Sequence, residues 1–195
     1  MHEHWKTIFG HFPTGKILKE VSTMNQEVHI EAYDAAWADQ YAAEAMNICS
    51  ALGNAELLLE HIGSTAVPGL SAKPVVDMML GVEKLCQIDE WKGQLEAIGY
   101  EEVHHPDMPE RRFFRKGPRG AGTHHLHIYV YQSEAWNNQW LFREELRRSL
   151  AKRKDYERLK QTLAHLYPHD RKRYTAAKAP FIQRTIKQAQ RCRLP

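Results

Sequence analysis

The sequence predicts an α+β fold, in which a mixed β-sheet is flanked by helices and a helical part follows at the C-terminus. Short segments with the periodicity or composition of strands are spread over residues 27–132, and two helical segments interrupt them. From residue 134 onward the apolar residues recur only at helical spacing. With 195 residues, of which 43% are apolar, the chain is long enough for one domain with a real core.

The N-terminal part divides into an extension, a strand and a helix. Residues 1–26 show no sustained periodicity, so we expect an N-terminal extension ahead of a single domain over residues 27–195. Apolar and polar side chains alternate in EVHIEAY, which predicts a half-buried strand over residues 27–33. Asp34 can then cap a helix that ends at Gly53.

The middle of the chain alternates strands with one further helix. LLLEHIG predicts a strand that Gly63 ends, and VVDMMLGV, after Pro74, has the continuous apolar character of a strand buried on both faces. The apolar spacing from Leu85 to Ile98 is helical. Three more segments have strand character: YEEVHH, RRFFRKG and THHLHIYVYQ.

The C-terminal part is predicted to be helical throughout. One apolar stripe begins after Glu134 and a second ends before Pro168. Asp170 can cap a last helix, which Pro180 is expected to shorten or kink because proline lacks a backbone donor.

Charge is unevenly distributed along the chain. Residues 1–140 contain 11 Lys and Arg against 19 Asp and Glu, whereas residues 141–195 contain 16 against 5, so net charges of −8 and +11 give the overall +3. The basic part could bind nucleic acid or a polyphosphate, or it could be the solvated face of helices that pack on an acidic body. The second interpretation is favoured.

Two further features bear on location. No apolar run approaches the roughly 20 residues of a membrane-spanning helix, and the N-terminus lacks a secretory signal pattern, so a cytoplasmic protein without a membrane segment is expected. The three cysteines are widely spaced and form no C-x-x-C pair, which argues against a disulfide framework and a zinc ribbon.

Asp77 interrupts the most apolar segment of the chain, VVDMMLGV. Burying an unpaired carboxylate is costly, so this position requires a cationic partner, a metal ion or a ligand. In a strand Asp77 shares a face with Met79 and Gly81, which leave room for a ligand. A structural ion pair with Lys73 or an arginine is the alternative explanation.

Two histidines of the segment THHLHIYVY fall on one face of the predicted strand. His125 and His127 are two residues apart, a geometry common in metal sites because both imidazoles point into the same space. Asp77 on a neighbouring strand could supply a third ligand, with His61 or His124 nearby. A row of His and Tyr is equally typical of the polar face of an antiparallel strand, and both interpretations stay open.

Two segments suit phosphate. Gly63 and Ser64 follow a strand and precede a turn, where backbone N–H groups and a short hydroxyl can approach phosphate oxygens, although a strand-ending turn explains the glycine as well. RRFFRKG carries Arg112, Arg115 and Lys116, and arginine binds phosphate with two donors. An exposed edge strand kept soluble by charge is the alternative.

Taken together, five segments are similar to the GrpB family (UPF0157), which is assigned to the DNA polymerase β-type nucleotidyltransferase superfamily. These segments are LEHIGSTAVPGLSAKPVVDMMLGV, RRFFRKGPRG, THHLHIYVY, WNNQWLFREELR and YTAAKAPFIQ. The resemblance runs from about residue 27 to about residue 186 and implies a nucleotidyltransferase-like fold. Such domains also occur fused to dephospho-CoA kinase in some bacteria, which implies a link to nucleotide or coenzyme metabolism.

The resemblance implies roles for individual residues. It assigns phosphate binding to Gly63 and Ser64 and metal binding to Asp77, where a divalent metal would bridge carboxylates and a triphosphate. The sequence departs from the pattern at Met79, where a second carboxylate is expected, and histidines stand where a third would lie. Mg²⁺ or Mn²⁺ is the cofactor that the resemblance implies, and Zn²⁺ is the alternative that histidine ligands favour.

The leading hypothesis is a nucleotidyltransferase-like protein that binds a nucleotide or phosphate ester with a divalent metal, nucleotidyl transfer being the implied reaction. The catalytic candidates are Asp77 and His127. The candidate metal ligands are Asp77, His125 and His127. The candidate ligand-binding residues are Gly63, Ser64, Lys73, Arg112, Arg115 and Lys116.

Two rival hypotheses stay open. One is a non-catalytic ligand-binding or accessory domain linked to coenzyme A metabolism, which the missing acidic positions favour. The other is RNA binding through the basic C-terminal helices, which ranks last because no stacking motif accompanies the charge, so nucleic acid is not the expected partner. The sequence leaves a homodimer open.

Overall fold

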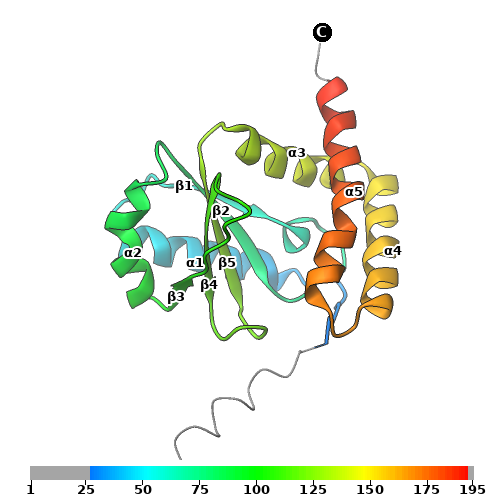
Figure 1. The fold of residues 1–195 in the computed structure, drawn as a ribbon, viewed down its shortest axis with the longest axis horizontal. Coiled ribbons are helices and arrows are strands. Elements are labelled where there is room, and N and C mark those ends of the chain that lie inside the picture. Colours follow the sequence, from blue (N-terminus) through cyan, green and yellow to red (C-terminus); the bar gives the residue numbers. More distant parts are fainter. Residues whose placement is uncertain (1–26, 193–195) are drawn as a thin grey trace, which may run out of the picture.

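A five-stranded sheet forms the centre of the molecule, with the strand order β1-β2-β5-β4-β3 (Figure 1). The computed structural model describes residues 27–192, so the predicted extension lies outside the described residues. The strands are Leu58–Ile62 (β1), Val76–Val82 (β2), Tyr100–Glu102 (β3), Arg111–Lys116 (β4) and His124–Val130 (β5). Because β2 and β5 are parallel while the other neighbours are antiparallel, the mixed sheet of an α+β fold is confirmed.

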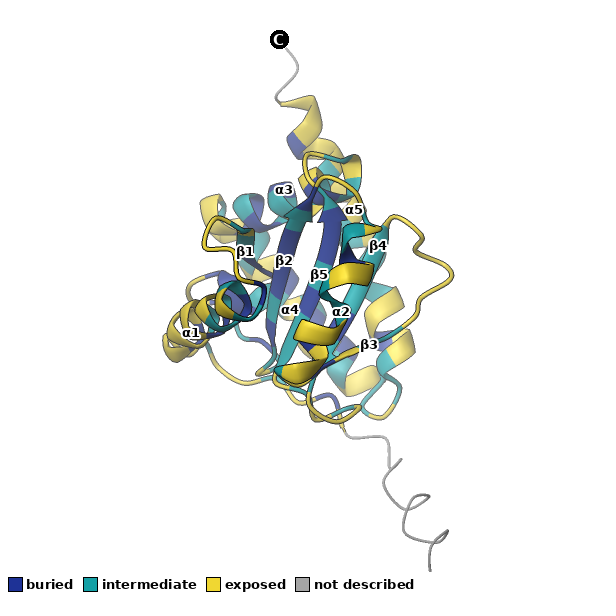
Figure 2. Cartoon of the chain, turned by 90° about the vertical axis from the view of Figure 1, so that its left-hand side faces the viewer, coloured by how far each residue is buried: buried dark blue, intermediate teal, exposed yellow. Residues whose placement is uncertain are grey.

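Helices cover both faces of the sheet and are not confined to one face or end of it. The helices are Ala36–Ala51 (α1), Gln87–Ala97 (α2), Glu134–Arg148 (α3), Leu150–Leu166 (α4) and Arg171–Arg191 (α5), with a short 3₁₀ turn (η2) at Ser64–Ala66. Figure 2 shows the central strands β2 and β5 buried along most of their length, while the outer sides of α1 and α2 are exposed.

The side chains of β2 point alternately into two separate cores. Met78 and Leu80 belong to a large cluster formed with α1 and α2. Met79 points to the opposite face, where it packs with Tyr129 of β5 and Trp136 of α3. The fully apolar character of this strand is therefore explained by burial on both faces, as the sequence predicts.

The edge strand β1 is closed by side chains. The Tyr41 hydroxyl of α1 donates to the Leu59 carbonyl at 3.0 Å, and the Arg143 guanidinium of α3 donates to the His61 carbonyl at 2.7 Å. Arg143 is only 5% exposed and also pairs with Glu60 at 2.6 Å. These contacts satisfy backbone groups that an open edge would offer to another strand.

The prediction of a strand over residues 27–33 is wrong. Glu31 makes one isolated bridge to Ala72, and the Val28 amide donates to the Pro168 carbonyl at 2.7 Å. Val28 is buried against Leu163 of α4 and Tyr174 of α5. The alternating apolar residues therefore pack against α4, α5 and the turn between them, and residues 27–33 form no ladder of strand hydrogen bonds.

Helix α5 differs from its prediction in length. It runs through Pro180 to Arg191, so the proline does not shorten it. Asp170 caps it as predicted, with its carboxylate accepting a hydrogen bond from the Arg173 amide at 3.0 Å. Across residues 27–192, neither α5 nor any other helix combines the length and the apolar content needed to cross a membrane.

Candidate functional site

The parallel register of β2 and β5 brings together one carboxylate and two imidazoles. Asp77 lies opposite His125, and Met79 lies opposite His127, so Asp77 and both histidines share one face of the sheet. Asp77 Oδ1 lies 2.9 Å from His125 Nδ1 and 3.7 Å from His127 Nε2. One potential ligand atom from each of the three residues lies within 4.8 Å of the others, which is close enough to hold a single metal ion.

Gly63 lies directly against Asp77. A Cβ atom at this position would come within 2.4 Å of Asp77 Oδ2, and the φ angle of +72° also disfavours any side chain. The next residue, Ser64, begins η2 and lines the same cavity as Asp77. The glycine is therefore required by the close approach of the carboxylate as well as by the turn.

The Asp77 carboxylate is stabilised in its charged form. Burial alone raises the pKa of this carboxyl group, but the hydrogen bond to His125 and the nearby His127 lower it well below its usual range. Burial lowers the pKa of His127, and Asp77 offsets part of this effect. Arg111 of β4 completes the chain of contacts, with its guanidinium 2.9 Å from His127 Nδ1. Since arginine only donates, this contact requires Nδ1 to be the acceptor and favours a proton on Nε2, facing Asp77.

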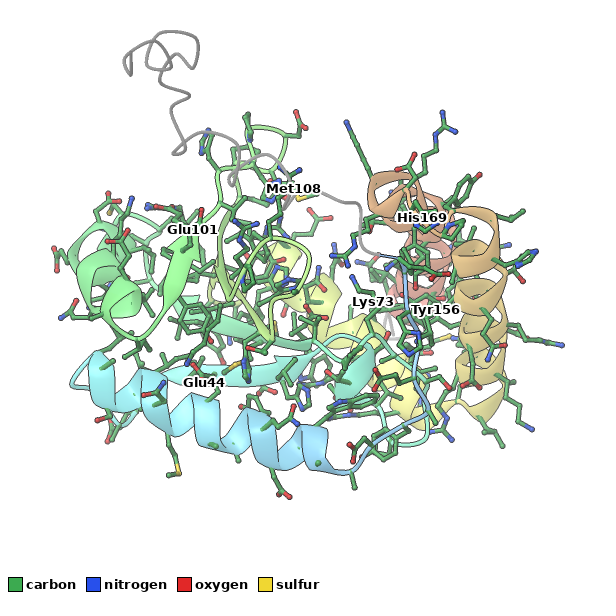
Figure 3. All side chains as sticks on the ribbon, turned by 90° about the horizontal axis from the view of Figure 1, so that it is seen from below. Glu44, Lys73, Glu101, Met108, Tyr156 and His169 are labelled. Carbon is green, nitrogen blue, oxygen red and sulfur yellow. The ribbon has the colours of Figure 1, made fainter. Side chains whose placement is uncertain are left out.

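These groups line a cavity of about 380 Å³ between the sheet and the C-terminal helices. Its other wall carries the side chains of Lys73, Lys160 and Lys178. Figure 3 shows Lys73 between the loop that carries Met108 and the turn that carries His169. Asp77 is the one carboxylate among the described residues that line this cavity, so the cavity is rich in positive charge.

Two predicted ligand-binding cations lie on the opposite face of the sheet. Arg112 donates to Glu102 of β3, and Lys116 contacts both carboxylate oxygens of Glu44 in α1 at 2.9 Å. The alternation of β4 explains this placement, because its even-numbered residues face α1 and α2. The structure does not bring Arg112 or Lys116 to the Asp77 cleft.

Arg115 is on the same face as His125, its partner in the β4–β5 register. Its guanidinium pairs with Glu101 at 2.8 Å, and Arg115 is not among the residues that line the cavity. The cation of β4 that does line it is Arg111. Sequence alternation allowed either set of residues to face the site, so it could not decide between them.

His61 and His124 do not join the two other histidines. The His61 ring stacks on Tyr41 of α1 at a centroid distance of 4.8 Å, and its Nε2 lies 3.0 Å from the Thr65 hydroxyl. Burial lowers the pKa of His61 to about 4. His124 lies opposite Lys116 in the sheet and shares its face. Both histidines therefore belong to the face covered by α1 and α2.

Four residues of the cleft are not singled out by the sequence analysis: Arg111, Lys160, Tyr174 and Lys178. A signal for Lys160 exists, because it follows Tyr156 by four residues on the apolar stripe of α4 and is only 2% exposed. Tyr174 and Lys178 lie in the segment YTAAKAPFIQ, which contributes to the family resemblance.

Some of the C-terminal basic side chains are paired within the protein. Arg147 pairs with Glu144 at 3.2 Å, and Lys152 pairs with Glu145 at 2.5 Å. Arg143 contacts Glu144 at 2.8 Å in addition to Glu60. Glu144 and Glu145 lie within the basic part itself, and Arg143 connects this part to the preceding sheet through its ion pair with Glu60.

Comparison with known sequences assigns the chain to a family. The GrpB protein family model matches residues 27–188. A UPF0157 protein of Halalkalibacterium halodurans is 34% identical over 171 residues, which cover 87% of this chain and 86% of that protein. A dephospho-CoA kinase of Mycobacterium leprae is 28% identical over 180 residues, which cover 76% of this chain but only 43% of the kinase.

Solved structures lead to the same family. The crystal structure of the conserved protein GrpB from Enterococcus faecalis matches with a TM-score of 0.75 and 34% identity, covering 84% of this chain and 98% of that one. The Cid1 poly(U) polymerase matches with a TM-score of 0.46 and 15% identity, a similarity too low to build on. Fold and site thus define an α+β domain with a charged cleft. The chain belongs to the GrpB family.

Proposed function

We propose that this protein binds a nucleotide or another phosphate ester in the Asp77 cleft together with one divalent cation. A single observation carries the proposal: the cluster of Asp77, His125 and His127 and the wall of Lys73, Lys160 and Lys178 line one cavity. A cation bound to the cluster and a phosphate group near the lysines would neutralise each other, as in many phosphate-binding sites.

The described residues suggest what each side of the cleft does. Asp77 and the two histidines would hold the cation, and the mixed nitrogen and oxygen donor set suits Mn²⁺ or Zn²⁺ better than Mg²⁺. Arg111 would orient His127 through its hydrogen bond. Gly63 allows the backbone to approach a bound phosphate closely, and the Ser64 hydroxyl adds a polar group beside it.

Nucleotidyl transfer at this site is implied by the family resemblance. A bound cation would lower the charge barrier to attack on a phosphorus atom. With Nδ1 of His127 held by Arg111, its Nε2 would serve either as a cation ligand or as the proton carrier, not as both. Met79 stands where a second carboxylate is expected, and it is fully buried against Ile62 and Trp136. The proposed chemistry therefore relies on one cation and not on two.

The buried Met79 also favours a second candidate function, a non-catalytic ligand-binding domain. The partial match to a dephospho-CoA kinase supports a link of such a domain to coenzyme A metabolism. Incubation with nucleoside triphosphates and coenzyme A precursors distinguishes the two candidates. Cation-dependent release of pyrophosphate supports transfer, whereas tight binding with no change in the ligand supports the second candidate.

Isothermal titration of the protein with Mn²⁺, Zn²⁺ and Mg²⁺ tests the cation site. We expect Asp77→Asn to weaken cation binding roughly 10-fold to 100-fold, because it removes the one anionic ligand. Asp39→Asn, at an exposed position in the first turn of α1, is the matched control and should bind as the wild type does. Equal cation binding by the wild type and Asp77→Asn would overturn the assignment.

A further inference from the structure

The C-terminal helices present two matched pairs of side chains on the cavity side of α4 and α5. Tyr156 and Lys160 are four residues apart on α4, and Tyr174 and Lys178 are four residues apart on α5. In each pair the ammonium lies over the tyrosine ring, with Nζ 5.1 Å from the ring centroid for Lys160 and 4.5 Å for Lys178. Both lysines and Tyr174 line the cavity opposite Asp77.

In residues 27–192, no carboxylate lies within ion-pair distance of these lysines. Ion pairs elsewhere in residues 27–192 include the lysines Lys92, Lys116 and Lys152. Over the same residues, no ion pair includes Lys73, Lys160 or Lys178. Lys160 donates a hydrogen bond to the Ser71 carbonyl, which leaves its charge in place. A tyrosine ring attracts an ammonium group without cancelling its charge, so no group of opposite charge among the described residues blocks a ligand here.

The ammonium groups are close enough to repel one another. Burial, together with the charge of Lys178, lowers the pKa of Lys160 to about 7, and Glu157 opposes part of this shift. Burial also lowers the pKa of Lys178 to about 8, with Asp77 opposing this shift and Lys73 adding to it. Clustered ammonium groups reduce the stability of the folded protein, and a bound anion would relieve this cost.

We infer that Lys160 and Lys178, with Lys73 beside them, form a binding site for a phosphate dianion that does not require the cation. The inference rests on the proposed function, because it specifies which group of the proposed ligand these three lysines bind. The two tyrosines act as supports that hold the ammonium groups in position.

The charge and shape of the wall favour a dianion over other anions. A phosphomonoester carries a charge of about −1.5 to −2 and three strong acceptor oxygens. A phosphodiester or a carboxylate carries a single charge, so it balances fewer of the ammonium groups. The dianion could belong to a phosphomonoester or to the last phosphate of a polyphosphate chain, since both present the same terminal group.

Thermal unfolding in EDTA, with potassium phosphate added at constant ionic strength, tests the inference without any cation. We expect phosphate to raise the melting temperature of the wild type, because a ligand that binds the native state stabilises it. Lys178→Met and Lys160→Met should each weaken this effect, with the apparent phosphate affinity falling roughly 10-fold. Methyl phosphate should act as phosphate does, and dimethyl phosphate should act much more weakly.

Matched controls come from the same two helices. Lys154→Met on α4 and Lys172→Met on α5 change exposed lysines and should respond to phosphate as the wild type does. Without phosphate, Lys178→Met should have an unchanged or higher melting temperature than the wild type, and this result would show that the variant folds. If it does not fold, Lys178→Gln takes its place. No response of the wild type to phosphate, or an undiminished response in both lysine variants, would overturn the inference.

Two further experiments complete the test. The first separates the inference from the proposed function, and the second distinguishes the two possible sources of the dianion. Asp77→Asn should bind the cation roughly 10-fold to 100-fold more weakly yet retain the response to phosphate in EDTA, so the cation site can fail while the phosphate site stands. Adenosine monophosphate and adenosine triphosphate, compared in EDTA, distinguish the two sources of the dianion. A stronger response to the monophosphate identifies a phosphomonoester, and a stronger response to the triphosphate identifies a polyphosphate chain.

Discussion

Two groups of cations, one on each side of the β-sheet, differ in their partners within residues 27–192: those of β4 that face α1 and α2 are paired with carboxylates, whereas the two lysines of α4 and α5 that face the cleft are not. On the face covered by α1 and α2, Arg112 is paired with Glu102, and Lys116 is paired with Glu44. On the cleft face, Lys160 and Lys178 rest on tyrosine rings and have no carboxylate partner in the described part of the chain.

This difference separates charges that serve the fold from charges that are available to a ligand. A paired charge on the covered face stabilises its partner, so its removal leaves a buried group uncompensated. An unpaired cluster on the cleft face reduces stability, and such a cost is expected at a site selected for binding. The variants below test the contrast on both faces, in order of expected effect.

The largest effect is expected at Gly63, on the cleft face. Gly63→Ala would place a Cβ within 2.4 Å of Asp77 Oδ2 at a φ of +72°, so both the carboxylate and the turn must move. We expect a loss of about 4 kcal/mol in the free energy of unfolding from overpacking and backbone strain together. Urea unfolding followed by circular dichroism measures this loss.

Gly69→Ala is the control for backbone strain alone. Its φ of +75° is nearly the same, but no atom lies within 4 Å of the added Cβ. We expect a loss of about 1 kcal/mol there. If the two variants lose equal stability, the contact with Asp77 is not what requires glycine at position 63.

A pH effect is expected from His61, on the covered face. Burial lowers the pKa of His61 from 6.5 to about 4, so the unfolded chain binds a proton at a higher pH than the folded protein does. The contribution of His61 is therefore lost as the pH falls from about 6.5 toward 4, and it amounts to about 2.5 kcal/mol between pH 7 and pH 4.5. His61→Gln should flatten this part of the stability profile, and urea unfolding at both pH values measures the change. An equally steep fall in the variant would contradict the prediction.

The fold and the grouping of Asp77, His125 and His127 could be predicted from the sequence because both follow from strand alternation. Once VVDMMLGV and THHLHIYVY are neighbouring strands, the period of two residues places Asp77, His125 and His127 in defined directions. The same rule could not decide whether Arg111 or Arg112 faces the site, because it separates the two faces of a strand without saying which one holds the site. The register between β4 and β5 supplies that choice.

The lysine wall could not be derived from local patterns. Lys160 and Lys178 come from helices that follow the sheet in the chain, and only the packing of α4 and α5 beside the loop before β2 brings them to Asp77. The prediction of a strand over residues 27–33 was wrong for a related reason. Their alternation is genuine, but tertiary packing gives it a use other than sheet formation.

A pair of lysine variants compares the two faces directly. Lys116→Met removes the partner of Glu44, which is only 8% exposed, and we expect a loss of about 2 kcal/mol in the free energy of unfolding at pH 7. Lys178→Met removes a charge from a repelling cluster and should leave this free energy unchanged or slightly higher. Urea unfolding of both variants measures the difference. Should Lys178→Met lose as much stability as Lys116→Met, its charge would be needed by the fold, and the distinction between the two faces would not hold.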